Sequence, residues 1–433
     1  MNKSDILIIG AGAAGLMAAR SLTNTGKKVT LLEARDRCGG RIHTLTQGPV
    51  FNTVELGAEF VHGDLPVTLN LLKEAGIPYH HTGGEMWHYQ EGHFDKEGPF
   101  AGDWDLLMDK LGKLERDISI EDFLQNEFPG DKYDSLKNSV RKYASGYDTA
   151  DTAKASSFAL RKEWQSEEFS QYRIKGGYGA MVNYLEEEFK KGGGVIHLNS
   201  VVTAIHWQAG RVKVITGAGK TYEVAQILIA LPLGVLQAEK GATAAIAFYP
   251  PIPGYTKAIN AMGFGAVIKV LLEFKEPFWE DKLTEKLAGK SLKNMGFLLS
   301  DEDIPTWWTQ MPQHRPVLTG WLGGPAAAAK KNLTDKEILQ QSLQSISNIF
   351  KRDIEELRNR LAAHYIMNWT NNPFTRGSYV YDTVESVAAR KILNDPVENT
   401  LFFAGEYLYE GPIMGTAEAA LTSGEQVAKK IIG

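Results

Sequence analysis

The sequence predicts an α/β protein with two interleaved domains, one with a Rossmann-like parallel sheet and one of mixed α+β structure. Two observations predict this fold class. Residues 6–33 read as strand, glycine turn, helix and strand, which is a βαβ unit. A glycine turn followed by a helix returns near residue 176, and strand and helix patterns return after residue 370, without a low-complexity linker. A chain of 433 residues, 43% hydrophobic and 23% charged, is long enough for two large buried cores.

The opening unit carries the pattern G-x-G-x-x-G between two predicted strands, Ile6 to Ile9 and Val29 to Leu32, with a helix that runs to about Thr25. The glycines permit a tight turn and a close backbone approach to a pyrophosphate, which the helix N-terminus attracts. A carboxylate at the end of the second strand can accept hydrogen bonds from ribose hydroxyls. The alternative is a glycine turn that serves packing alone. The residues expected to contact the nucleotide in this unit are Gly10, Gly12, Ala14, Gly15 and Glu33.

The next residues read Ala34-Arg35-Asp36-Arg37-Cys38-Gly39-Gly40-Arg41. The second glycine pair offers another backbone loop, and an arginine can bind phosphate with two hydrogen bonds. In this segment the chain resembles the FAD-dependent amine oxidases, the family of monoamine oxidases, polyamine oxidases, flavin-type histone lysine demethylases and L-amino acid oxidases. A solvated arginine-rich loop is the alternative. The resemblance implies FAD as the cofactor and adds four contacts to it, Ala34, Arg35, Gly40 and Arg41.

Other segments carry the same resemblance. Residues 55–63 resemble the polyamine-oxidase-like segment under the flavin ring, and residues 369–379 resemble the family's W-x-x-x-P-x-x-x-G-S-Y segment. Residues 401–406 read as a strand that ends at a glycine and an acid, and residues 415–432 as a closing helix whose N-terminus points at the flavin. The further FAD contacts that the resemblance implies are Leu56, Gly57, Ala58, Glu59, Val202, Trp369, Gly405, Glu406, Gly415, Thr416 and Ala417.

The resemblance also implies how the domains interleave. We expect an FAD domain from residues 1–79, 176–244 and 370–433, and a substrate domain from residues 80–175 and 245–369. Residues 79–175 are predicted to consist of polar, aromatic and helical segments without strand–helix alternation. The other predicted elements are a helix over 66–75, strands over 195–198, 201–207, 211–216 and 227–231, strands near Phe297 and Leu318, and a helix over 335–350.

Lys269 lies in the apolar run from Met262 to Trp279, which we predict to be a strand. A charged lysine is costly to bury inside an apolar strand, so we expect desolvation to lower its pKa and to favour the neutral amine. The alternative is a lysine on an edge strand that reaches solvent. The surrounding Gly-x-x-x-Lys and Glu-Pro-Phe-Trp residues resemble the family's lysine at flavin N5. The resemblance implies that Lys269 is catalytic, holding a water near N5 and assisting the oxidation of reduced flavin by O2.

Tyr379 resembles one wall of the family's aromatic cage, and aromatic faces attract an amine. The covalent family members carry cysteine just before this tyrosine, whereas this chain has Ser378, so we expect FAD to be bound noncovalently. The opposite wall falls at Thr416, where many of these oxidases have tyrosine. Glu59 and His62 resemble pocket residues of polyamine oxidases, with a purely structural role as the alternative. The catalytic candidates are therefore Lys269, Tyr379 and Thr416, and the substrate-binding candidates are Glu59, His62, Tyr379 and Thr416.

Composition excludes several other classes of protein. The net charge is −5 and no basic block appears, so we expect no nucleic-acid partner. The longest apolar run, Ile227 to Leu236, is too short for a membrane span and contains Pro232. The single cysteine, Cys38, can form neither an intrachain disulfide nor a cysteine metal cluster, and residues 1–5 do not resemble a signal peptide, so we expect a reducing, cytoplasmic compartment. The histidines show no metal-binding spacing, so we expect no metal.

These observations together predict oxidation of a primary or secondary amine, with a polyamine as one option. The amine is oxidised to an imine, which is hydrolysed to an aldehyde, and O2 is reduced to H2O2. Three alternatives stay open: an L-amino acid oxidase, a desaturase-like enzyme and a non-catalytic FAD protein. The residues that resemble the family least, 80–175 and 280–365, are also the ones expected to select the substrate.

Overall fold

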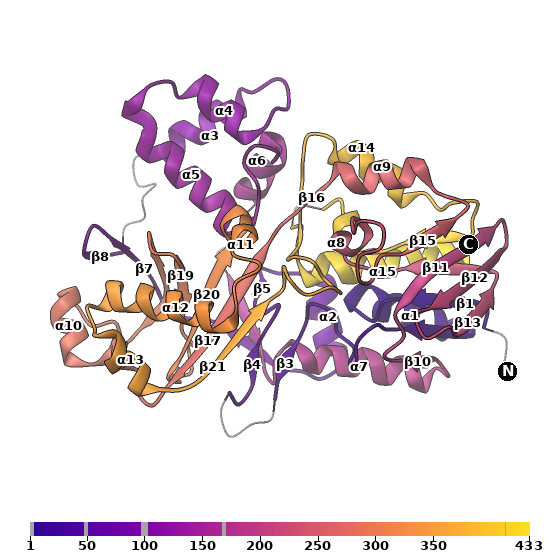
Figure 1. The fold of residues 1–433 in the computed structure, drawn as a ribbon, viewed down its shortest axis with the longest axis horizontal. Helices are drawn as coiled ribbons and strands as arrows, with labels where there is room; N and C mark the ends of the chain where they lie inside the picture. The colour runs from indigo at the N-terminus through magenta and orange to yellow at the C-terminus, as the bar shows by residue number, and fades with distance from the viewer. Residues whose placement is uncertain (1–3, 47–50, 97–102, 167–169, 412) are drawn as a thin grey trace.

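The computed structural model describes residues 4–46, 51–96, 103–166, 170–411 and 413–433. Two large sheets lie side by side in it, one on the right of Figure 1 with both chain ends and one on the left, and a group of helices stands above the left sheet. The predicted α/β class is confirmed.

The right-hand sheet has five parallel strands in the order β10-β2-β1-β14-β23. Its strands are four residues or shorter and almost wholly apolar, as expected for a sheet covered on both faces. Helix α1 packs against both α7 and α15. The predictions for these strands and helices are confirmed to within about three residues. Their bounds are β1 Ile6–Ile9, α1 Ala13–Asn24, β2 Val29–Leu32, α7 Tyr178–Lys191, β10 Val195–His197, β14 Gln226–Ile229, β23 Leu401–Phe403 and α15 Ala417–Ile432.

A smaller four-stranded sheet, in the order β13-β12-β11-β15, lies beside it. The polar strand β13 escaped prediction because half of its residues are exposed and it has no apolar run. Strand β15 lies beyond the expected domain boundary at residue 244, yet it pairs with β11. The bounds here are β11 Val202–Gln208, β12 Arg211–Thr216, β13 Thr221–Val224, α8 Leu233–Leu236, β15 Ala247–Tyr249, α9 Pro253–Ala261 and α14 Ser386–Asn394.

The left-hand sheet has seven strands in the order β21-β17-β20-β19-β18-β7-β8. Its core is built against α12, which begins with a capping box between Thr334 and Glu337 and presents an apolar face. The predicted bounds of α12 are confirmed. The elements are β7 Glu85–Gln90, β8 His93–Asp95, β17 Val267–Phe274, η2 Phe278–Glu280, α10 Lys282–Ala288, β18 Met295–Ser300, β19 Thr306–Trp308, β20 Val317–Gly323, α11 Gly324–Ala329, α12 Asp335–Phe350, α13 Ile354–Arg360 and β21 Leu361–Asn368.

Residues 79–81, 85–90 and 93–95 form strands, so the expectation of helical segments was wrong there. Aromatic residues such as Trp87 and Tyr89 favour strands and are buried against the left-hand core. The helices follow only from residue 104. The remaining elements are β3 Thr44–Leu45, β4 Val54–Glu55, β5 Val61–His62, α2 Pro66–Glu74, β6 Tyr79–His81, α3 Trp104–Gly112, α4 Ile120–Glu127, η1 Asp131–Tyr133, α5 Asp134–Gly146, α6 Ser157–Gln165, β9 Gln171–Ile174, β16 Gly263–Phe264, β22 Val380–Tyr381 and η3 Glu406–Leu408.

Candidate active site and cofactor contacts

The glycine turn after β1 leaves an open cradle at the N-terminus of α1. A Cβ on Gly12 would meet no atom within 4 Å, and Gly12 caps the helix without a side-chain hydrogen bond. Gly10 has φ +105°, which favours glycine, and a Cβ on Gly15 would overlap the backbone of Gly10. Glu33, at the end of β2, accepts a hydrogen bond from the Ala11 amide at 2.8 Å. The turn, the helix end and the carboxylate therefore lie together.

The second glycine loop and its arginines join the N-terminal unit to the C-terminal segments. A Cβ on Gly40 would lie 3.3 Å from Cα of Gly12, so the two glycine loops are in contact. Nη1 of Arg41 lies 3.0 Å from Oε1 of Glu406 and also donates to the carbonyl of Ser378. Nη2 of Arg35 donates to Asn372 at 2.8 Å. Residues near 35, 41, 378 and 406 are brought together although most of the chain separates them.

The segment after Gly405 is held on the same side. Oε2 of Glu406 accepts a hydrogen bond from the Val380 amide at 3.3 Å, and the Gly405 amide donates to Ser423 of α15. Val202 lies at the other end of this region, because Ser200, two residues before it, donates a backbone hydrogen bond to the Glu33 carbonyl at 2.8 Å.

Lys269 lies on β17, between β20 and β21, so it is not on an edge strand. Its even-numbered neighbours on β17 face α12, and the alternation of a strand turns Lys269 to the opposite face, toward residues 56 and 57. The side chain is 1% exposed. Nζ lies 2.6 Å from Oε2 of Glu59 and 3.1 Å from the Gly57 carbonyl, and it lies 5.3 Å from the ring centroid of Trp308. The sequence identified both Lys269 and Glu59 but not their contact, and this contact supplies the counter-charge that the expectation of a neutral amine left out.

Glu59 has a second cationic partner that the sequence did not reveal. Oε1 of Glu59 accepts a hydrogen bond from Arg173 of β9, whose Nη2 donates to the Thr309 carbonyl at 3.0 Å. Burial alone would raise the pKa of Glu59, but Lys269 and then Arg173 outweigh burial and lower it to about 2. The Glu59 carboxylate is therefore ionised and shared between two cations.

Gly57 lies where a backbone carbonyl and a tryptophan ring come close to the chain. A Cβ there would overlap the Arg41 carbonyl and would lie 3.2 Å from the Trp369 ring. Trp369 in turn donates from Nε1 to the Leu56 carbonyl at 2.8 Å. This contact fixes the segment that runs beneath Lys269 against the C-terminal part of the chain.

Tyr379 lies against Gly415, the residue before Thr416, and the Thr416 hydroxyl has a structural use. A Cβ on Gly415, which has φ +68°, would lie 2.8 Å from Cδ2 of Tyr379. The Thr416 hydroxyl accepts from the Ala419 amide at 3.2 Å and caps α15. The Tyr379 hydroxyl donates to the Tyr147 carbonyl. Thr416 therefore serves as an N-cap, a function that a tyrosine side chain does not supply.

A partly exposed aromatic cluster extends between Lys269 and Tyr379. Neighbouring rings in it have centroids 5.6 to 6.3 Å apart, and Tyr147 is 36% exposed although it lies beside Tyr379. Burial lowers the pKa of His62 to about 4, so this member is a neutral imidazole at neutral pH. Apart from His62, sequence reasoning missed the cluster, because its residues lie in four segments whose proximity only the fold creates. We call this group the aromatic cluster: Phe60, His62, Tyr143, Tyr147, Trp308 and Trp321.

Comparison with known proteins identifies the family. The family model described as flavin containing amine oxidoreductase matches residues 13–432. The chain belongs to the flavin-containing amine oxidoreductases. The resemblance inferred from the sequence is thereby confirmed.

Three known proteins illustrate this oxidoreductase's relatives. It is 30% identical to human lysine-specific histone demethylase 2 over 99% of its own length and 53% of the human protein. It is 27% identical to polyamine oxidase 4 of Oryza sativa subsp. japonica, covering 99% of this chain and 89% of the rice protein. The structure of cyclohexylamine oxidase from Brevibacterium oxydans IH-35A superposes with a TM-score of 0.79 at 20% identity, over 99% of this chain and 98% of that one, which shows a common fold. The chain spans about half the length, or less, of the histone demethylases it matches.

A flavin dinucleotide fits the residues present. The open cradle at Gly12 and the uncapped start of α1 suit a pyrophosphate, and the Glu33 carboxylate suits a ribose. Arg41, Gly57 and Trp369 would hold the other end near Lys269. Among the described residues, no helix is long and apolar enough to cross a membrane, and no group of three acids, histidines or cysteines has the arrangement of a metal site.

Proposed function

We propose that the enzyme binds FAD without a covalent bond and oxidises a primary or secondary amine to an imine, with O2 as the electron acceptor. The amine gives up two electrons and two protons, O2 becomes H2O2, and water hydrolyses the imine to an aldehyde and ammonia or a smaller amine. FAD, when bound, supplies the two-electron chemistry. Family membership and the rice polyamine oxidase support this reaction.

The arrangement of Lys269 and Tyr379 is the observation that carries the proposal. The buried ammonium of Lys269 lies at one end of the aromatic cluster, and Tyr379 lies at the other, against Gly415. Aromatic faces between these residues attract and orient an amine through the ring quadrupole. The Tyr379 end thus suits the substrate amine, and the Lys269 end suits an oxidant that gains negative charge.

The residues have separate proposed roles. An alkyl amine must lose its proton before oxidation, which costs roughly 4 kcal/mol at pH 7 for a pKa near 10. A desolvating aromatic surface with a neutral His62 favours the uncharged amine. Lys269 holds a positive charge where O2 is reduced, and such a charge stabilises the developing anion. Glu59 holds Lys269 in place, and the two cations beside Glu59 balance the negative charge of its carboxylate.

The paired state of Glu59 bears on the substrate. A carboxylate shared between Lys269 and Arg173 is not available for a second ammonium of a diamine. This favours an amine with one charged nitrogen and an apolar body, whereas the rice relative favours a polyamine. The L-amino acid alternative needs an arginine for the substrate carboxylate, and both Nη atoms of Arg173 already donate to protein acceptors.

The remaining parts of the proposal concern attachment, partners and compartment. Ser378 offers a hydroxyl where the covalent relatives have a thiol, and it contacts Thr149 at 3.0 Å.

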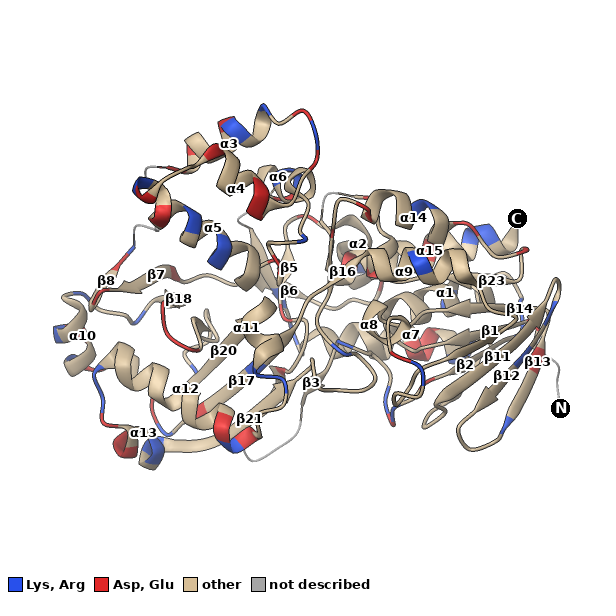
Figure 2. Cartoon of the chain, turned by 45° about the horizontal axis from the view of Figure 1, so that its top comes forward, with Lys and Arg blue, Asp and Glu red and all other residues tan. Residues whose placement is uncertain are grey.

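Acidic and basic residues are interspersed along the helices in Figure 2, with a net charge of −5, which gives no footprint for nucleic acid. The one cysteine, Cys38, is a buried free thiol, which suits a cytoplasmic protein.

Two linked measurements test this proposal. Acid precipitation of the purified yellow protein should leave FAD in the supernatant, and colour that stays with the precipitate overturns noncovalent binding. Anaerobic titration with benzylamine, cyclohexylamine, putrescine, spermine and L-amino acids should bleach the flavin with at least one amine, and air should restore the colour. Bleaching by amino acids alone selects the L-amino acid oxidase, and no bleaching at all selects a non-catalytic or desaturase-like protein.

A further inference from the structure

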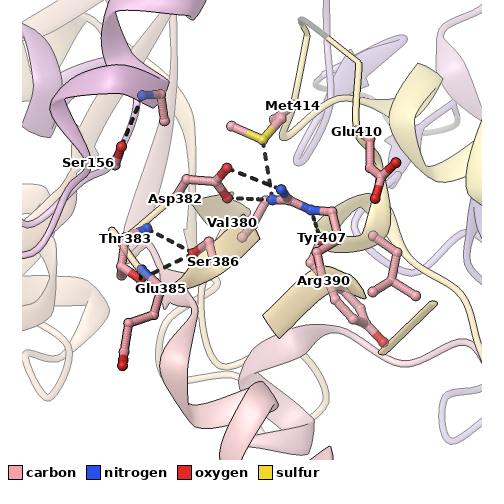
Figure 3. Close-up of polar contacts among 12 residues, drawn as sticks. Ser156, Val380, Asp382, Thr383, Glu385, Ser386, Arg390, Tyr407, Glu410 and Met414 are labelled. Carbon is pink, nitrogen blue, oxygen red and sulfur yellow. Dashed lines mark hydrogen bonds and ion pairs between the residues drawn. The ribbon is translucent and has the colours of Figure 1, made fainter. Parts of the chain in front are cut away.

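Arg390 of α14 is a buried arginine whose guanidinium contacts three separate segments of the chain (Figure 3). Nη1 donates to Oδ2 of Asp382 at 3.2 Å, and Nη2 donates to Oδ1. Nε donates to the Tyr407 carbonyl at 3.0 Å, and Nη2 lies 3.5 Å from the sulfur of Met414. Arg390 is 4% exposed and Asp382 is 7% exposed, so solvent does not compete for these contacts.

The three segments are those that carry the proposed amine site. Asp382 lies three residues after Tyr379, and Met414 lies two residues before Thr416. Tyr407 directly follows the acid that pairs with the arginine of the second glycine loop. The guanidinium therefore connects the segments on both sides of the proposed site, and none of its described contacts is to the aromatic cluster.

The Asp382 end is also tied to the helices above the left-hand sheet. The Ser156 amide donates to the Asp382 carbonyl at 2.8 Å, and Ala155 bridges to Thr383. Since Tyr147 precedes this strand-like contact and accepts the hydrogen bond of Tyr379, the contacts fix the whole Tyr379 side of the site to one frame.

We propose that Arg390 is a positioning residue that sets the spacing between Tyr379 and the turn at Gly415 and Thr416. The inference rests on the proposed function, since it concerns the opening that admits the amine. The spacing is tight, because a Cβ on Gly415 would lie only 2.8 Å from the Tyr379 ring. A displacement of a few tenths of an ångström on either side changes the surface that an amine meets.

The geometry of arginine matters for this role. A planar guanidinium offers five N–H donors in fixed directions, whereas a lysine offers one compact charge. Lysine at position 390 can neutralise Asp382, but it cannot also reach the Tyr407 carbonyl in the opposite direction with the same rigidity. If Arg390 served only as a counter-charge to Asp382, lysine could replace it. If Arg390 sets the spacing between the two segments, lysine cannot replace it.

The chain contains a matched control, the ion pair between Arg352 and Asp281. Arg352 is 6% exposed, and its Nη2 lies 2.6 Å from both carboxylate oxygens. It belongs to the region of α10, α12 and α13 at the far left of Figure 1, away from the right-hand sheet. Loss of this pair should cost stability without altering the amine site.

The test compares Arg390→Gln, Arg390→Lys, Arg352→Gln and the double variant Arg390→Met/Asp382→Leu, which leaves no unpaired buried charge. For each, the thermal midpoint, FAD retention, KM and kcat for the best bleaching amine, and hydrogen exchange of peptides covering 376–384 and 405–416 are measured. We expect Arg390→Gln to raise KM at least about tenfold, a difference of about 1.4 kcal/mol, and to raise exchange in both peptides. Compared with Arg390→Gln, Arg390→Lys should bring the thermal midpoint closer to the wild-type value than it brings KM. Arg352→Gln should lower the midpoint and leave KM and both peptides unchanged.

Each outcome decides the inference. If Arg390→Gln or the double variant loses only thermal stability, as Arg352→Gln does, Arg390 is a structural counter-charge and the inference is wrong. The same holds if Arg390→Lys restores KM fully. If no amine bleaches the wild type, the proposed function fails, and the exchange of the two peptides alone then decides whether Arg390 fixes them. Should Arg390→Gln not fold, the lysine and double variants carry the comparison.

Discussion

The Nζ atom of Lys269 lies 2.6 Å from Oε2 of Glu59, and both side chains are buried. Glu59 is held from its other oxygen by Arg173, so one carboxylate stands between two cations beside the segment expected under the flavin. This arrangement separates two roles that the sequence left joined. In the proposed function, Lys269 acts beside the cofactor, and Glu59 holds Lys269 in place.

Replacing Lys269 by methionine should slow reoxidation of the reduced enzyme by O2 at least about tenfold, or about 1.4 kcal/mol in barrier. Methionine keeps the length and apolar packing and deletes the charge, while Arg173 still neutralises Glu59. FAD should stay bound and reduction by the amine should change less. Stopped-flow traces of both half-reactions make the comparison, with Lys275→Met, just beyond β17 and exposed, as the control. Unchanged reoxidation in Lys269→Met means that Lys269 is only a structural lysine.

Replacing Glu59 by glutamine should destabilise the fold by about 3–5 kcal/mol, because it leaves two buried cations without their counter-charge. KM for amines should stay within about threefold, since Glu59 is not assigned to the substrate. The control is Glu223→Gln, whose exposed pair with Arg211 at 3.4 Å should contribute under about 1 kcal/mol. Denaturant unfolding and steady-state kinetics measure the two effects. A tenfold rise in KM with full stability would instead place Glu59 at the substrate.

His62 should make stability fall as pH drops below 6.5. Burial lowers the pKa of His62 from 6.5 to about 4, so the unfolded chain takes up this proton first. The stability that the neutral His62 contributes is complete above pH 6.5 and is lost as pH falls toward about 4. Comparison of His62→Phe with wild type across this window should show a smaller loss in the variant. The exposed His93→Phe serves as control, and identical pH profiles for wild type and His62→Phe would refute the assignment.

Thr416 should matter to stability through its hydroxyl. Thr416→Val should cost about 1 kcal/mol by removing the N-cap of α15, while Thr416→Ser should cost little because serine caps equally well. Thermal unfolding of the three proteins at matched FAD loading makes the measurement. Equal midpoints for valine and serine would show that the cap is unimportant and would return Thr416 to the list of substrate contacts alone.

Local sequence patterns predicted the elements whose signals are local. The βαβ unit, α12 and the strand around Lys269 follow from apolar periodicity, glycine turns and a capping box. The partner of Lys269 did not follow from any pattern, since Glu59 and Arg173 come from segments about 210 and 96 residues away along the chain, and only the fold brings them together.

The aromatic cluster escaped prediction for the same physical reason. Tyr147 ends a helical segment and Trp308 lies on β19, and an isolated aromatic residue in a sequence reads equally well as core. Thr416 is a different case. A threonine one residue before a helix is a local capping signal, and the resemblance to an aromatic cage drew attention away from it.

The most direct test of amine oxidation is a product balance on the air-saturated wild-type enzyme with the amine that bleaches it best. O2 uptake, H2O2, aldehyde and residual amine are measured in the same reaction. The account predicts one H2O2 and one aldehyde for each amine and each O2 consumed. Peroxide that forms without loss of amine, or loss of amine without aldehyde, would contradict it.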